Sequence, residues 1–191
     1  MAKVYDRAMA KELLREDRVK RLQPEKVVEV LGLSGGETVG DIGCGPGIFT
    51  LLLAKKVGEK GKVFGIDTSQ DMLDVLDERA ETAGLGNIEG VHSEETKIPL
   101  RDNMLDALLL ANLLHHASDK VIFLREIWRL LAHRGRLLVM EPKAGSGDAQ
   151  QKKDRLPLKE IQTYLVQVGF RDVSVHPILD DYEVVAARKE E

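Results

Sequence analysis

A loop of closely spaced glycines constrains this chain more than any other feature. The loop reads Val39-Gly40-Asp41-Ile42-Gly43-Cys44-Gly45-Pro46-Gly47, and the helical period of residues 48–57 follows it. Glycines at every second position let a ligand approach the backbone closely. Open parallel sheets bind ligands where a strand meets the helix that follows it. The sequence therefore predicts a ligand site at the end of its first strand.

The spacing of the glycines and two carboxylates indicate the kind of ligand. Gly-x-Gly-x-Gly differs from the Gly-x-Gly-x-x-Gly of dinucleotide-binding proteins. Asp41 would repel a pyrophosphate and favour a positive group such as an amino-acid ammonium, directly or through water. Asp67 ends the next apolar run, about 20 residues beyond the loop, where an acid can accept hydrogen bonds from both ribose hydroxyls. S-adenosylmethionine, with a ribose and a cationic amino acid but no pyrophosphate, meets this description.

From residue 38 onward, short apolar runs alternate with helical periods. The runs predict strands at residues 39–42, 62–66, 87–91, 105–111 and 136–140. Helices are predicted between them, one capped by Thr68, one capped by Ser118 with Trp128 on its core face, and a later one begun by Pro157. Runs that are apolar almost throughout are buried on both faces, as in a parallel sheet. Two further strands in the tail, ending with residues 182–187, predict an edge hairpin. The pattern as a whole is typical of a doubly wound α/β fold.

Length and composition narrow the class of protein. The 191 residues are 43% apolar, enough for the core of one domain. We divide that domain into an N-terminal arm at residues 1–23 with a charged helix at 8–22, a core at 24–188, and a polar flap at 143–156. A net charge of −4 gives no clear signal for nucleic-acid binding. With one cysteine and no zinc spacing among five histidines, no metal is expected. No apolar run approaches the ~20 residues of a membrane span, so we expect a cytoplasmic protein.

Three stretches carry a resemblance to a known family. They are Asp41-Ile42-Gly43-Cys44-Gly45-Pro46-Gly47, Gly65-Ile66-Asp67-Thr68-Ser69 with Met72, and the run from Leu130 to Pro142. Together they resemble the class I S-adenosylmethionine-dependent methyltransferases, in the branch of ubiquinone/menaquinone-type and related small-molecule methyltransferases. The resemblance implies a Rossmann-like seven-stranded sheet in the order 3-2-1-4-5-7-6 with the last strand antiparallel. It also implies S-adenosylmethionine as cofactor, S-adenosylhomocysteine as product and a small-molecule acceptor.

The resemblance implies which residues bind the cofactor and leaves the catalytic residues unknown. Glu94 falls at the acidic position after the third strand, one methylene longer than the family's aspartate. The loop that begins at Asn112 corresponds to the one that borders the methionine part of the cofactor. The expected cofactor-binding residues are Asp41, Gly43, Cys44, Gly45, Gly47, Asp67, Thr68, Met72, Glu94, Glu95 and Asn112.

Several residues have a structural interpretation beside a functional one. Cys44 is a candidate nucleophile, but a small side chain in a tight loop explains it better, since no basic residue adjoins it in sequence. His115 and His116 can supply a general base or only shape their loop, and we favour the second. Tyr5 either packs on the cofactor within an ordered arm or belongs to a frayed terminus.

The resulting hypothesis is methyl transfer by in-line displacement, which needs a base only when the acceptor must lose a proton. A non-catalytic S-adenosylmethionine-binding sensor or partner subunit is the alternative. A nicotinamide-dependent dehydrogenase ranks third, because the glycine spacing and Asp41 argue against it. The arm and the flap are short and polar, which predicts an open site. Either these segments close over it, or the second subunit of a homodimer does.

Overall fold

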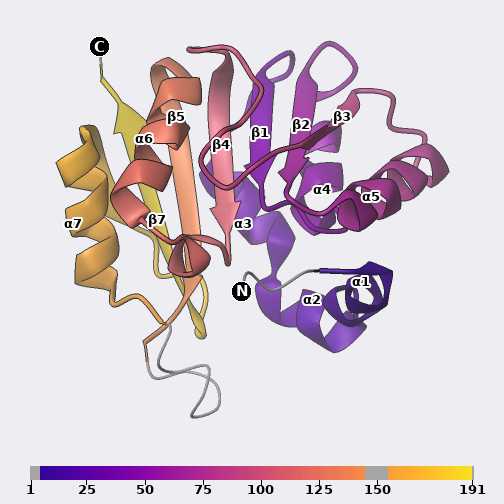
Figure 1. Ribbon diagram of the computed structural model, residues 1–191, viewed down its shortest axis with the longest axis horizontal. Helices are drawn as coiled ribbons and strands as arrows, with labels where there is room; N and C mark the ends of the chain where they lie inside the picture. Colours follow the sequence, from indigo (N-terminus) through magenta and orange to yellow (C-terminus); the bar gives the residue numbers. More distant parts are fainter. Residues whose placement is uncertain (1–4, 145–154, 191) are drawn as a thin grey trace.

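The computed structural model describes residues 5–144 and 155–190, which build a seven-stranded sheet (Figure 1). The strand order is β3-β2-β1-β4-β5-β7-β6, as the resemblance implied. The strands are β1 (Thr38–Ile42), β2 (Lys62–Asp67), β3 (Ile88–His92), β4 (Leu105–Ala111), β5 (Leu131–Pro142), β6 (Phe170–Val175) and β7 (Tyr182–Lys189).

Parallel pairing joins β3, β2, β1, β4 and β5, whereas β7 runs antiparallel to both of its neighbours. The predicted edge hairpin of β6 and β7 is confirmed. Strand β5 begins earlier than the sequence predicted, because Leu131 already pairs with Leu105 of β4. The next paired residue of β5 is Arg136, and the residues between Leu131 and Arg136 form a bulge.

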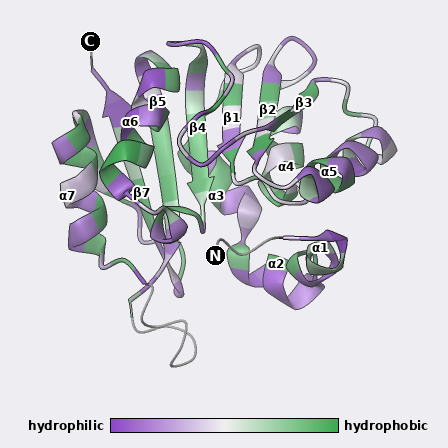
Figure 2. Ribbon diagram, in the orientation of Figure 1, coloured by the Kyte–Doolittle hydropathy of each residue, from purple (hydrophilic) through white to green (hydrophobic). Residues whose placement is uncertain are grey.

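Helices cover both faces of the sheet. One face carries α3 (Pro24–Val30) and α4 (Ile48–Val57), and the other carries α6 (Lys120–Leu130) and α7 (Leu158–Val168). Helix α5 (Gln70–Thr82) packs against the edge formed by β2 and β3. Strand β4 supplies both cores, with Leu108 and Leu110 on one face and Ala107 and Leu109 on the other. Burial on both faces explains why β4 is apolar except for the exposed Asp106, and Figure 2 shows a hydrophobic centre under more hydrophilic helices.

The N-terminal arm holds two helices where the sequence predicted one. Helices α1 (Arg7–Leu13) and α2 (Glu16–Leu22) are separated by an extended Arg15. The predicted ion pairs within α2 are present, at 2.6 Å for Lys20–Glu16 and 3.8 Å for Arg21–Asp17. Both helices lie beyond the carboxyl ends of the parallel strands (Figure 1). Because the chain turns between them, the arm folds over that edge instead of projecting from it.

Two predicted helix caps were wrong by one residue. The hydroxyl of Ser69, not Thr68, accepts the amide of Met72, at 3.3 Å. Asp119, not Ser118, caps α6, because the Ser118 hydroxyl donates to Glu95 instead, at 2.9 Å. Helix α6 also ends before Leu131, which begins β5, and its predicted core residue Trp128 is half-buried.

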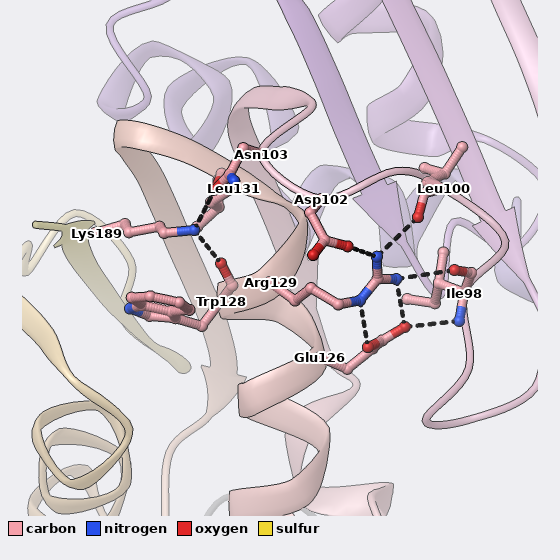
Figure 3. A network of polar contacts seen from close by, with 9 residues as sticks. All are labelled: Ile98, Leu100, Asp102, Asn103, Glu126, Trp128, Arg129, Leu131 and Lys189. Atoms are coloured by element: carbon pink, nitrogen blue, oxygen red, sulfur yellow. Dashed lines mark hydrogen bonds and ion pairs between the residues drawn. The ribbon is translucent and has the colours of Figure 1, made fainter. Parts of the chain in front are cut away.

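Two basic side chains, Lys189 and Arg129, connect α6 to the elements around it (Figure 3). The ammonium of Lys189, which is 2% exposed, donates to Asn103 Oδ1 at 2.7 Å and to two carbonyls at the junction of α6 and β5. Arg129 pairs with Glu126 and Asp102 and donates to the carbonyls of Ile98 and Leu100. The loop between β3 and β4 is thereby attached to α6.

Most of the predicted flap at 143–156 lies outside the described residues, so the structure does not address it. Within the part that is described, no helix is long and apolar enough to cross a bilayer.

Candidate functional site

A cavity of about 760 Å³ lies at the carboxyl ends of β1, β2 and β4, within the range of about 300–1,000 Å³ that is usual for small-molecule sites. The glycine loop, the segments after β2, β3 and β4, and the N-terminal arm all contribute to its wall. All of the expected cofactor-binding residues line it except Gly47. That glycine is the residue before α4 and has a φ of 80°. The parallel sheet brings these residues together because its strands end at one edge.

The glycine loop curls tightly over the end of β2. The amides of Gly43 and Cys44 both donate to the carbonyl of Ile66, at 2.8 and 3.1 Å. Gly43 has a φ of 67°, and a Cβ placed there would lie 2.8 Å from the side chain of Leu113. A larger residue would therefore strain the loop and collide with the segment after β4.

Cys44 contributes a small side chain rather than a reactive one. Its sulfur is buried, and burial, followed by the charges of Asp41 and Asp67, raises the pKa of the thiol well above its usual value. A thiol kept protonated is a poor nucleophile, so this geometry supports the structural interpretation.

Asp41 is a buried carboxylate at the wall of the cavity. It is 2% exposed and accepts a 2.6 Å hydrogen bond from the hydroxyl of Thr50 on α4. Burial raises the pKa of Asp41 to about 7, with a further contribution from Asp67, although the bond from Thr50 opposes the shift. A cation beside Asp41 would restore its ionised form. The sequence analysis did not predict this role of Thr50. The feature that could have indicated it is a hydroxyl residue within an otherwise apolar helical period.

Asp67 holds the loop as well as facing the cavity. One oxygen accepts the amide of Gly45 at 2.8 Å, and the other accepts the amide of Ser69 at 2.9 Å. Burial raises the pKa of Asp67, whereas these backbone amides lower it. A carboxylate offers about four acceptor positions, so acceptance from ribose hydroxyls stays a prediction. The loop-holding role was not predicted.

The two glutamates after β3 differ in their surroundings. The carboxylate of Glu95 accepts both the amide and the hydroxyl of Ser118, at 2.5 and 2.9 Å. Glu94 exchanges backbone hydrogen bonds with Lys97, which closes a tight turn. Both glutamates line the cavity, but only Glu95 also ties the β3–β4 loop to the start of α6.

The segment after β4 is held by Glu141, a completely buried residue of β5. One oxygen of Glu141 accepts the amides of Leu113 and Leu114, at 2.9 and 2.7 Å. The other lies 2.5 Å from Nδ1 of His115. This arrangement separates the two histidines, since His116 lines the cavity and His115 does not. The sequence analysis did not predict this role of Glu141. The feature that could have indicated it is an acid at the end of an apolar run, as at Asp41 and Asp67.

The arm brings side chains of its own to the cavity, from Tyr5, Leu13, Arg18 and Leu22. The carbonyl of Tyr5 accepts a 2.5 Å hydrogen bond from the hydroxyl of Ser69. An ion pair between Arg7 and Glu78 attaches α1 to α5. This placement favours the ordered-arm interpretation of Tyr5.

The comparisons with known proteins agree with this geometry. Residues 33–171 match the family model described as "Methyltransferase domain". The chain is 32% identical over 141 residues to the demethylmenaquinone methyltransferase of Staphylococcus aureus (strain JH9), covering 74% of this chain and 56% of that protein. The chain thus spans little more than half the length of the curated relatives it matches.

Solved structures give the same picture. An S-adenosylmethionine-dependent methyltransferase from Aquifex aeolicus aligns with a TM-score of 0.88 and 33% identity, over 96% of this chain and 98% of that one. The phosphoethanolamine N-methyltransferase 2 of Haemonchus contortus shares the fold, with a TM-score of 0.74 and 17% identity over 88% of this chain and 52% of that one. That structure holds phosphomonomethylethanolamine and S-adenosylhomocysteine.

Proposed function

The chain belongs to the class I S-adenosylmethionine-dependent methyltransferases, and we propose that it transfers the methyl group of this cofactor to a small organic acceptor. The observation that carries the proposal is the pair Asp41 and Asp67. They lie at the ends of adjacent strands, on either side of the glycine loop, at the wall of one cavity. No described residue is assigned a catalytic role on sequence grounds alone.

The residues at the cavity fit the chemistry of the cofactor. Asp41 is buried without a basic partner among the described residues, so an ammonium group would supply the missing charge. Asp67 keeps acceptor positions for hydroxyl groups while it holds the amide of Gly45. Gly43, whose φ of 67° and contact with Leu113 leave no room for a side chain, presents bare backbone to the cavity. Glu94 and Asn112 are proposed to contact the adenine amine and the methionine part.

Bound S-adenosylmethionine supplies an electrophilic methyl group, so the chain mainly has to position an acceptor atom in line with it. Apolar side chains of Leu13, Phe49, Leu113 and Phe123 line the cavity and would hold an apolar acceptor body. Of the neighbouring pair His115 and His116, only His116 lines the cavity, where His92 also lies, and His116 is the candidate base for an acceptor that must lose a proton. The relatives named above as demethylmenaquinone methyltransferases support an apolar cyclic acceptor.

Calorimetry with S-adenosylmethionine, S-adenosylhomocysteine and NAD tests the cofactor assignment. We expect both adenosyl ligands to bind and NAD to bind far more weakly, and tighter binding of NAD would contradict the proposal. A screen of acceptors with methyl-labelled cofactor then tests turnover. Transfer of label to an acceptor excludes the non-catalytic alternative. Binding without transfer to quinols, phenols, amines or carboxylates would favour a sensor or partner subunit.

A further inference from the structure

We propose that Arg18 forms an oxyanion-binding subsite in the roof of the cavity, suited to a carboxylate or an equivalent acidic group. The inference rests on the proposed function for the identity of the ligands, but its own evidence is the placement of one guanidinium. Arg18 lies on α2, which Figure 1 shows beyond the carboxyl ends of the strands. Its side chain lines the cavity together with Tyr5 and Leu13.

The basic residues around Arg18 are neutralised, and Arg18 is not. Arg15 and Arg21 both pair with Asp17, and Lys20 pairs with Glu16. These side chains are largely exposed. Arg18 instead donates to the carbonyl of Leu13 at 3.0 Å, and within residues 5–144 and 155–190 no carboxylate lies at ion-pair distance from it.

This placement leaves a partly desolvated cation that has no counter-ion among the described residues. Burial lowers the pKa of Arg18, although a guanidinium stays charged at any physiological pH. Its electrostatic neighbours are the phenol groups of Tyr5 and Tyr182 and the guanidinium of Arg21, and no carboxylate is among them. Within the described part of the chain, the negative charge that Arg18 lacks would therefore come from a ligand oxyanion.

The geometry of the donor selects the ligand chemistry. A guanidinium presents five N–H donors in a planar fork that matches a carboxylate with two parallel hydrogen bonds. The bond to Leu13 uses one nitrogen, Nη1, and leaves further donors for an incoming group. Four acidic residues, Asp41, Asp67, Glu94 and Glu95, line the same cavity. A ligand with a cation at one end and a carboxylate at the other would satisfy both these acids and Arg18.

Two molecules can bring such a group, the amino-acid end of the cofactor or an acidic acceptor, and two binding experiments distinguish them. The first compares S-adenosylhomocysteine with its decarboxylated analogue by calorimetry. The second compares benzoate with its neutral counterpart benzamide by ligand-observed NMR, with and without saturating S-adenosylhomocysteine. The variants are Arg18→Gln and Arg18→Lys, with Arg21→Gln as the matched control on the same helix.

The subsite predicts that one carboxylate probe loses about 10- to 100-fold in affinity in Arg18→Gln. The neutral probe of the same pair should be unaffected, and Arg18→Lys should fall between. A loss for S-adenosylhomocysteine identifies the cofactor as the source, and a loss for benzoate identifies the acceptor. Arg21→Gln should bind every probe like the parent protein. Equal affinities of parent and Arg18→Gln for both carboxylate probes would overturn the inference.

These readouts separate the inference from the proposed function. If S-adenosylhomocysteine does not bind the parent protein, the proposed function fails, and the benzoate experiment without cofactor still tests Arg18. If it binds the parent and Arg18→Gln equally and benzoate shows no preference over benzamide, only the subsite fails. Thermal unfolding of Arg18→Gln, compared with Arg18→Lys, which keeps the charge and most of the side-chain volume, checks that lost affinity does not reflect lost folding.

Discussion

Nδ1 of His115 lies 2.5 Å from a carboxylate oxygen of Glu141, and both side chains are almost completely shielded from solvent. The same carboxylate accepts the amides of Leu113 and Leu114. One buried acid on β5 therefore fixes the whole turn after β4, including the residue that presents His116 to the cavity. The conformation of this wall depends on a contact across the sheet, not on its local sequence.

Replacing Glu141 with alanine should destabilise the protein by about 3 kcal/mol or more. The change leaves one buried amide, of Leu114, and one partly buried amide, of Leu113, without an acceptor, at roughly 1–3 kcal/mol each, and removes the partner of His115. Urea unfolding measures the effect. His115→Ala should also destabilise the protein, whereas Glu29→Ala, at an exposed position of α3, should change the stability by less than about 0.5 kcal/mol. Similar stabilities for Glu141→Ala and Glu29→Ala would contradict the anchoring role.

The affinity for S-adenosylhomocysteine should fall as the pH is lowered through 7. Asp41 has a pKa of about 7 in the folded protein, so below that pH its carboxyl is neutral and cannot pair with an ammonium group. We expect the dissociation constant to rise by up to about tenfold per pH unit below 7. Calorimetry between pH 5.5 and 8.5 tests this, with Asp41→Asn as the comparison. The variant should bind weakly with little change over that range, and an equally steep profile in the variant would assign the titration to another group.

The contribution of Asp41 to the free energy of unfolding should change with pH in the opposite direction to the affinity. The folded pKa of Asp41 lies above the unfolded value of about 3.9, so the folded state binds the proton more tightly. The contribution of Asp41 to the free energy of unfolding should therefore fall as the pH rises from about 4 to about 7, and level off above 7. Asp41→Asn removes this contribution, which denaturant unfolding at several pH values would reveal.

Asp67→Ala should weaken both the cofactor and the fold. Sequence reasoning predicts only the loss of hydrogen bonds to ribose, worth about 1.5–3 kcal/mol each. The structure adds the amides of Gly45 and Ser69, which lose their acceptor. We expect weaker binding by calorimetry and about 1–2 kcal/mol less stability by urea unfolding. Asp71→Ala, at an exposed position in the first turn of α5, is the control and should keep its affinity. Unchanged binding in Asp67→Ala would reduce Asp67 to a structural role.

Removing residues 1–13 should affect methyl transfer more than cofactor binding. The truncation deletes Tyr5 and Leu13 from the cavity wall but keeps Leu22, which is 1% exposed and belongs to the core. We expect S-adenosylhomocysteine to bind a few-fold more weakly and transfer to fall at least tenfold, because the acceptor loses its positioning. In Arg7→Ala the arm is kept and only an exposed ion pair is lost, so both quantities should stay within about twofold. Full turnover by the truncated protein would show that the arm has no part in the site.

The sequence by itself determined the strands of the parallel sheet and the edge at which the cavity lies. Nearly continuous apolar runs such as that of β4 indicate burial on two faces, and the helical periods between such runs indicate parallel crossovers. The glycine spacing and the acids Asp41 and Asp67 marked the edge at which the structure has its cavity. These features are local, since strand period, turn chemistry and the residue that ends a strand are all set within a few positions of one another.

Only the tertiary structure decided which groups the buried acids bind. Asp67 accepts the amide of Gly45, 22 residues away, and Glu141 contacts His115, 26 residues away. The break between α1 and α2, and the turn of Arg18 toward the cavity, likewise depend on the edge against which the arm folds. A side chain's hydrogen-bond partner is fixed by packing between elements that are distant in sequence, and such a contact leaves no periodic trace in the residues that make it.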